Sequence, residues 1–283
     1  MSNQLPSAGL GVVMRALLTS GRKARSLKQI FSATYSSHPP LQQHIHEYKK
    51  FTGHPGVTSA PLSYWYLIAQ RAQLALMMDP RFSYPVPGMV HISNVMHQFA
   101  PVDLSRDIDI EVNAKQEPMD ERGALYVNFD VQVSQLGTAQ VICKSRYLAK
   151  RATKRTGQSE IANRSKAGLI HFVDWTLEPD VGRQYAKISG DYNPIHLWPW
   201  SAKLLGFKRP IAHGMFLVAK TEAELEQAMG TPVTQLSATF LKPAMLPGQL
   251  RMERTSDRFQ IVSGATTCVT GTFSTEEIGS HKK

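Results

Sequence analysis

An acid and an imidazole stand five residues apart in the segment 185–196 of this 283-residue chain. The acid is Asp191 and the imidazole is His196, with Gly190 before the acid and Pro194 between the two. Gly and Pro are turn formers, so we expect a short helix to end here and a semi-rigid loop to present both side chains. Such a pair can take a proton from a bound molecule and return one without moving.

Each of these residues also has an ordinary structural explanation. An Asp before a turn often only caps it, and a single His is more often a structural group with satisfied hydrogen bonds. Asn193, directly before Pro194, is equally well explained as a turn residue. The combination of acid, imidazole and turn formers, rather than any one residue, favours acid–base chemistry.

Two blocks of sequence together resemble the signature of MaoC-like, (R)-specific enoyl-CoA hydratases. They are Ile-Ser-Gly-Asp-Tyr-Asn-Pro-Ile-His at 188–196 and Arg-Pro-Ile-Ala-His-Gly-Met at 209–215. The blocks stand in the family's order and at about its spacing, and the resemblance is strong over residues 170–273. It implies an α+β fold of the double hotdog type, in which each half is a long helix wrapped by a curled antiparallel sheet.

The resemblance implies a hydro-lyase that adds water to trans-2-enoyl thioesters to give (R)-3-hydroxyacyl thioesters, or runs the reverse dehydration. Asp191 and His196 would be catalytic, holding the water and moving the protons. Gly214, where we expect a helix to begin, would direct its backbone N–H at the thioester oxygen, although close backbone packing would also explain a Gly there. Asn193 would orient the loop or the hydroxyl group. No metal and no redox cofactor is implied.

Two other functions stay open at this point. A hotdog acyl thioesterase would share the fold, but an Asp and a His separated by four residues with Asn-Pro between them are typical of the hydratases. A non-catalytic acyl-thioester-binding protein would need an inactive site, against which the complete motif argues. Glu222 occupies a position near which some relatives have a small hydroxyl residue, and an inward-facing Glu222 would change the polarity of the pocket.

The formal net charge of +10 favours an anionic partner. The basic residues are scattered and accompany no nucleic-acid-binding motif, so we expect no nucleic acid partner. The thioester of coenzyme A or of an acidic acyl carrier protein fits the charge equally well. A double hotdog already contains the pairing that single hotdogs obtain by dimerising, so both a monomer and a homodimer are compatible with the sequence.

The cysteines and the hydropathy of the chain indicate in which cellular compartment the protein is expected. Cys143 and Cys268 lie in strand-like runs, and we expect both to be buried thiols in a cytoplasmic protein. No run of 18 apolar residues predicts a transmembrane helix. The first 46 residues contain no acid, which is typical of an organellar transit peptide or of a basic arm that weakly contacts an anionic surface; we favour the arm.

The order of predicted elements repeats along the chain. We expect a basic N-terminal arm at 1–40, an N-terminal hotdog half that has lost its site at 41–150, a polar linker at 151–168 and the MaoC-like half at 169–283. Tyr-Lys-Lys-Phe-Thr-Gly at 48–53 parallels Tyr-Ala-Lys-Ile-Ser-Gly at 185–190, which supports the repeat. Helices are predicted at 41–53, 61–78 and 212–229, and strands near 89–100, 106–114, 123–134, 138–149, 169–176, 233–241, 248–257 and 259–273.

Overall fold

The computed structural model describes residues 3–7, 9, 11, 15–16, 18–22, 30–56, 59–150 and 168–275. These residues form two compact units. The first unit takes its described residues from Met1–Gln42 and Trp65–Gln158, and the second takes them from Gln43–Tyr64 and Ser159–Glu276. Most of the predicted linker, residues 151–167, lies outside the described residues, as do residues 23–29 of the predicted basic arm.

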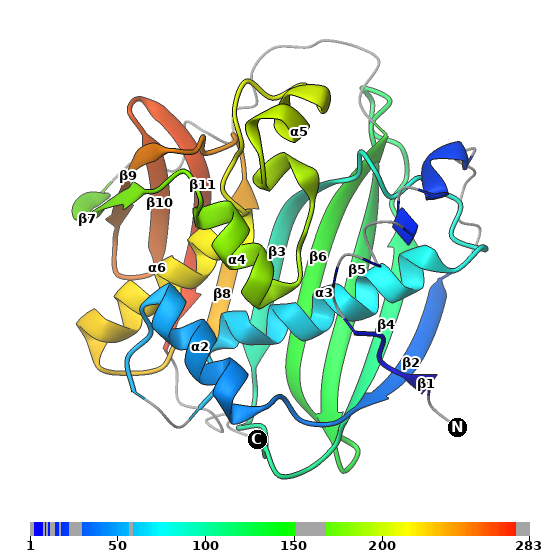
Figure 1. Ribbon diagram of the computed structural model, residues 1–283. Coiled ribbons are helices and arrows are strands. Elements are labelled where there is room, and N and C mark those ends of the chain that lie inside the picture. Colours follow the sequence, from blue (N-terminus) through cyan, green and yellow to red (C-terminus); the bar gives the residue numbers. More distant parts are fainter. Residues whose placement is uncertain are drawn as a thin grey trace. The chain divides into compact units, whose positions relative to one another are not determined.

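The first unit is a curled sheet with one long helix (Figure 1). Its strands pair in the order β1-β2-β4-β5-β6-β3, antiparallel throughout except for the parallel pair β1 and β2. The strands are β1 (Asn3–Gln4), β2 (Phe31–Ser37), β3 (Val90–Gln98), β4 (Ile108–Gln116), β5 (Leu125–Gln135) and β6 (Thr138–Lys150). The helix is α3 (Leu62–Met78), of which residues 65–78 belong to this unit.

Alternation along the strands explains how this sheet covers its helix. The apolar residues of β5 from Leu125 to Val133 are buried at every second position, so one face of the strand is apolar. Polar contacts also join the helix to the sheet: Gln73 of α3 donates to the hydroxyl of Ser145 at 2.9 Å and accepts from that of Tyr147 at 3.0 Å.

The second unit has the same plan with more helices. Its sheet is antiparallel throughout, in the order β8-β11-β10-β9-β7. The strands are β7 (Ile170–Leu177), β8 (Gln235–Phe240), β9 (Gly248–Arg254), β10 (Arg258–Ser263) and β11 (Thr266–Ser274). The helices are α2 (Gln42–Thr52), α4 (Val181–Ser189), η3 (Pro194–His196), α5 (Pro199–Leu204) and α6 (Gly214–Met229). A long helix accompanied by a curled antiparallel sheet is the hotdog arrangement, so the predicted α+β double hotdog fold is confirmed.

The predicted elements differ from the observed ones in several places. Strands β1 and β2 lie within the predicted basic arm, and α5 was not predicted. The single strand predicted at 259–273 is a hairpin, because Gly264 adopts a positive φ of 57° and turns the chain between β10 and β11. In addition, the segment Gln43–Tyr64 belongs by its contacts to the second unit, whereas the predicted boundaries group it with the N-terminal half.

The position of α2 has a clear physical cause. The ring of Phe51 lies 5.4 Å from that of Phe216 in α6 and 6.3 Å from that of Tyr185 in α4, measured between centroids. This aromatic contact places α2 in the second unit. Cys143 and Cys268 are both buried free thiols, as predicted. Among the helices in the described ranges, none is long and apolar enough to cross a membrane.

Candidate active site

The end of α4 sets the position of Asp191. The helix ends at Gly190, whose left-handed backbone (φ 77°) directs its N–H to the carbonyl of Ala186. The N–H of Asp191 then donates to the hydroxyl of Ser189 at 3.1 Å, and the Asp191 carboxylate accepts from the N–H of Asn193 at 3.2 Å. The short helix followed by a tight loop is as the sequence predicts.

Asn193 lies on the outer side of this loop. Its side-chain oxygen caps η3 by accepting from the N–H of Ile195 at 3.4 Å, and the residue is exposed. These contacts are the turn-forming role that the sequence also allowed. An orienting role toward a substrate hydroxyl group stays a prediction.

His196 is buried and held by its backbone surroundings. Its Nδ1 lies 2.8 Å from the carbonyl oxygen of Ile211 and donates to it, which leaves Nε2 without a proton in the neutral ring. Burial lowers the pKa of His196, and the charge of Asp191 and the bond to Ile211 oppose the shift. The neutral ring therefore offers Nε2 as a base.

Gly182 of α4 makes room for this arrangement. A Cβ added at Gly182 would lie 2.1 Å from the backbone oxygen of His196, closer than any side chain can approach. The backbone of η3 therefore rests directly on α4. Sequence reasoning did not identify Gly182, because nothing in its neighbourhood signals a close approach from a segment fourteen residues further along.

His213 connects the acid to the imidazole. Its Nε2 donates to the backbone carbonyl of Asp191 at 3.0 Å, and its ring stacks on that of His196 with the centroids 3.7 Å apart. Burial, followed by the neighbouring His196, lowers the pKa of His213 to about 3, so its ring is neutral. The sequence interpretation left His213 out as structural; its place in the second motif block, directly before Gly214, was the available signal.

Gly214 is the first residue of α6, as predicted. The side chain of the preceding residue, His213, makes no cap bond to the helix, whereas its backbone carbonyl accepts from the N–H of Phe216 at 3.1 Å. A Cβ at Gly214 would lie 2.5 Å from the ring of Phe240. Close packing and an N–H without an acceptor inside the helix are therefore both present at this position.

Two groups of side chains in the second unit are close enough to share a cation. The ligand atoms of Asp191, His196 and His213 lie within 4.8 Å of one another, and the same holds for His54, Glu222 and Glu226. Glu222 faces inward and is fully buried. Its carboxylate, however, contacts His54 and the first turn of α3, so it belongs to the second group and not to the first.

Comparison with known proteins gives a family match for the C-terminal part of the chain. Residues 160–278 match the family described as MaoC like domain. The chain carries a MaoC-like domain. This domain contains Asp191, His196, His213 and Gly214, and the resemblance expected from the two sequence blocks is confirmed.

This chain is also similar to several named proteins. It is 29% identical over 201 residues to the 3-hydroxyacyl-thioester dehydratase X of Mycobacterium tuberculosis, which covers 71% of both chains. It is 33% identical over 72 residues to an (R)-specific enoyl-CoA hydratase of Aeromonas caviae, covering 24% of this chain and 54% of that one. The crystal structure of HtdX from M. tuberculosis has the same fold, with a TM-score of 0.71 at 23% identity over 86% of this chain and 98% of that one.

Proposed function

We propose that the protein is a hydro-lyase that reversibly hydrates a trans-2-enoyl thioester to the (R)-3-hydroxyacyl thioester. The observation that carries the proposal is the meeting of two proton-transfer groups, Asp191 and His196, within the domain that also contains the uncapped start of α6. The names of the relatives, a 3-hydroxyacyl-thioester dehydratase and an (R)-specific enoyl-CoA hydratase, support the same reaction class.

In the proposed mechanism, a water molecule lies between the carboxylate of Asp191 and Nε2 of His196. One of the pair accepts a proton while the water oxygen bonds to C3 of the enoyl group. The electron pair of the C2–C3 double bond moves toward the thioester, whose oxygen becomes negative. A proton then returns from the Asp191–His196 pair to C2, so one water has been added and both side chains are restored.

The negative charge on the thioester oxygen needs a partner that is already in place. The N–H of Gly214 stands at the positive end of the α6 dipole and receives no cap from His213. We propose that it donates to this oxygen in the transition state. Asn193 is proposed to hold the Asp191 loop in place, because its backbone N–H donates to the Asp191 carboxylate.

The chemistry proposed here uses no metal or redox cofactor, because proton transfer and charge stabilisation are both supplied by protein groups. The substrate carrier is proposed to be coenzyme A or acyl carrier protein, whose phosphates suit a chain of net charge +10. We also propose that the protein is cytoplasmic, because its two cysteines, Cys143 and Cys268, are buried free thiols.

The test is the loss of absorbance of a conjugated enoyl thioester, first crotonyl-CoA and then a longer 2-enoyl-CoA. Wild-type protein is compared with Asp191→Asn and His196→Gln, each of which should lower kcat by at least about 100-fold. The second unit offers matched controls, because His171 and Asp174 form an exposed pair at 3.0 Å. His171→Gln and Asp174→Asn should leave the rate unchanged.

A thiol reagent in the same reaction separates the alternatives. Release of free coenzyme A without hydration would identify a thioesterase and overturn the proposal. Saturable binding of several chain lengths and of an enoyl-carrier-protein without turnover would identify a binding protein. Chiral analysis of the 3-hydroxyacyl product tests the (R) configuration independently.

A further inference from the structure

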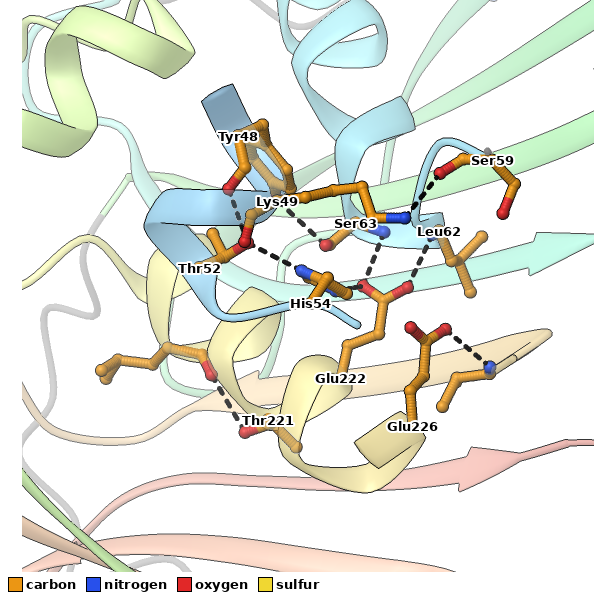
Figure 2. Close-up of polar contacts among 12 residues, drawn as sticks. Tyr48, Lys49, Thr52, His54, Ser59, Leu62, Ser63, Thr221, Glu222 and Glu226 are labelled. Carbon is orange, nitrogen blue, oxygen red and sulfur yellow. Dashed lines mark hydrogen bonds and ion pairs between the residues drawn. The ribbon is translucent and has the colours of Figure 1, made fainter. Parts of the chain in front are cut away.

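A second buried polar cluster lies in the same unit as Asp191 and takes no part in the proposed reaction. It consists of Lys49, His54, Glu222 and Glu226, and we call it the Glu222 cluster (Figure 2). Glu222 is fully buried, and only 6–7% of the surface of Lys49 and His54 is exposed. Buried charges are costly unless they are paired, so the arrangement requires an explanation.

The internal repeat relates this cluster to the candidate active site. Helices α2 and α4 end in the repeated sequence, and each is followed by a Gly with a positive φ, 90° at Gly53 and 77° at Gly190. Tyr48 and Tyr185, the first residues of the two copies, are both buried. His54 therefore occupies, in the first copy, the position of Asp191 in the second.

The repeat also relates the helices that follow. The next long helix after His54 is α3, and the next long helix after the Asp191 loop is α6. The first turn of α3 is therefore the counterpart of the first turn of α6, which the proposed function uses to bind a negatively charged thioester oxygen. Helix N-termini bind anions through their unpaired N–H groups and the helix dipole.

At the first turn of α3 the anion-binding position is occupied by a side chain of the protein itself. The Glu222 carboxylate accepts from the N–H of Leu62 at 2.6 Å and from the N–H of Ser63 at 2.9 Å, one bond to each oxygen (Figure 2). These are short, charge-assisted hydrogen bonds to the first two residues of the helix. At α6, by contrast, the cap residue His213 makes no such bond.

His54 turns its ring toward this carboxylate. The hydroxyl of Thr52 donates to the carbonyl of Tyr48 at 2.7 Å, so it must accept at its 2.7 Å contact with Nδ1 of His54. Nδ1 therefore carries a proton, and Nε2 faces Glu222 at 3.3 Å, fully buried and without a hydrogen-bond partner in the described structure. A buried imidazole nitrogen paired with the bound carboxylate is what an anion site that has acquired an internal ligand would contain.

The remaining members balance the charge. The ammonium group of Lys49 donates to the carbonyl of Ser59 at 3.2 Å and is attracted by both carboxylates. Glu226 accepts from the N–H of Val233 at 3.0 Å, and burial together with the charge of Glu222 raises the pKa of Glu226 to about 7. Glu226 is therefore partly protonated at neutral pH, which lessens the repulsion between the two carboxyl groups.

We propose that the first turn of α3 is a second anion-binding site, related by the internal repeat to the one at α6, and that the Glu222 carboxylate occupies it as an internal ligand. The chemical class that this site takes is a small carboxylate. Removing the side chain of Glu222 opens the site to such an ion in solution. With Glu222 in place, the site is closed.

Chemical rescue tests the proposal without any measurement of catalysis. Glu222→Ala leaves the N–H groups of Leu62 and Ser63 buried without acceptors, and its melting temperature should fall by about 5–10 °C. Sodium formate should restore at least half of this loss, saturably, relative to sodium chloride at equal ionic strength. Wild-type protein should show no difference between the two salts.

Two variants serve as matched controls. Glu226→Ala removes a carboxyl group one turn further along α6. The Glu222 carboxylate stays bound at the first turn of α3, so formate should not stabilise this variant specifically. Glu222→Gln retains the shape of the side chain and leaves no room for formate. If Glu222→Ala does not fold in chloride, refolding yield in formate and in chloride is compared by circular dichroism instead. The proposal is overturned if formate and chloride act equally on Glu222→Ala, or if Glu226→Ala is rescued to the same extent.

Discussion

The imidazole ring of His213 stacks on that of His196, with the ring centroids 3.7 Å apart and the planes inclined by 26°. The same ring donates from Nε2 to the backbone carbonyl of Asp191 at 3.0 Å. One side chain therefore contacts both proposed catalytic residues, although it has no proton-transfer role in the proposed reaction. We regard His213 as a positioning residue.

We predict that His213→Leu lowers kcat about 10- to 100-fold while KM changes little, because the ring orients the reacting groups and not the substrate. A double-mutant cycle with His196→Gln distinguishes positioning from general destabilisation. In the His196→Gln background the further loss should be small, since the partner of the stack is already absent. Equal losses in both backgrounds would contradict the positioning role, and the exposed His171→Leu is the control.

The pH dependence of the rate follows from the buried imidazoles. Burial lowers the pKa of His196, so Nε2 stays unprotonated to a lower pH than in a free imidazole. We predict that kcat/KM is flat from pH 8 down to about 6.5, the ordinary value for His, and falls only below it. An acid limb with its midpoint above 6.5 would show that the relevant imidazole is not His196 as described.

The same shifts affect stability with a definite sign. The folded pKa of His196 and of His213 lies below the unfolded one, so the unfolded chain binds more protons as the solution is acidified. These residues contribute stability that is present above about pH 6.5 and is lost as the pH falls through their folded pKa values. Circular dichroism at each pH therefore has to accompany the rate measurements, to separate protonation of the site from unfolding.

We predict that Gly182→Ala impairs both folding and activity. The new Cβ would lie 2.1 Å from the backbone oxygen of His196, and a backbone atom cannot move as a flexible side chain can. Within a helix the change would otherwise be stabilising by up to about 1 kcal/mol. A lower melting temperature together with a lower kcat would therefore show that the new Cβ disturbs the contact between α4 and the backbone of His196.

Gly21→Ala is the control for this substitution, because a Cβ at Gly21 meets nothing within 4 Å. It should change neither the melting temperature nor the rate appreciably. If Gly182→Ala retained wild-type activity and stability, η3 would have to be able to move away from α4 without loss, contrary to the expected rigidity of the His196 loop.

The sequence predicted the elements that carry strong local signals. The helices predicted at 41–53 and 61–78 match α2 and α3 closely, because apolar spacing and the following Gly or Pro mark their ends. The loop with Asp191 and His196 and the start of α6 at Gly214 were also predicted. In each case the information is contained within a few neighbouring residues.

The missed features depend on contacts between distant segments. Strand β2 does alternate apolar residues with Ser and Thr, but the pattern holds only three apolar residues; its pairing with β4 is what completes the strand. Helix α5, with six residues, is too short to show a periodicity. The contacts of His213 and Glu222 likewise join residues that the folded chain brings together, and residue type alone did not predict them.

The role of the Gly214 N–H can be separated from the packing of its Cα. A Cβ at Gly214 would meet the ring of Phe240 at 2.5 Å, so Gly214→Ala alone should be destabilised and inactive for steric reasons. Replacing the ring in the double variant Gly214→Ala/Phe240→Leu provides space while keeping the N–H. We predict that this double variant recovers most of the melting temperature and the rate.

Proline then removes the N–H at the same place. Pro is well tolerated at the first position of a helix, and His213 already has the extended backbone (ψ 130°) that a residue before Pro adopts. Gly214→Pro/Phe240→Leu should therefore fold like the Ala double variant, yet its kcat should be lower by about 100- to 1000-fold, the usual loss for one oxyanion donor. Equal rates in two equally stable double variants would exclude the N–H of Gly214 as the donor to the thioester oxygen, leaving close packing against Phe240 as the reason for glycine.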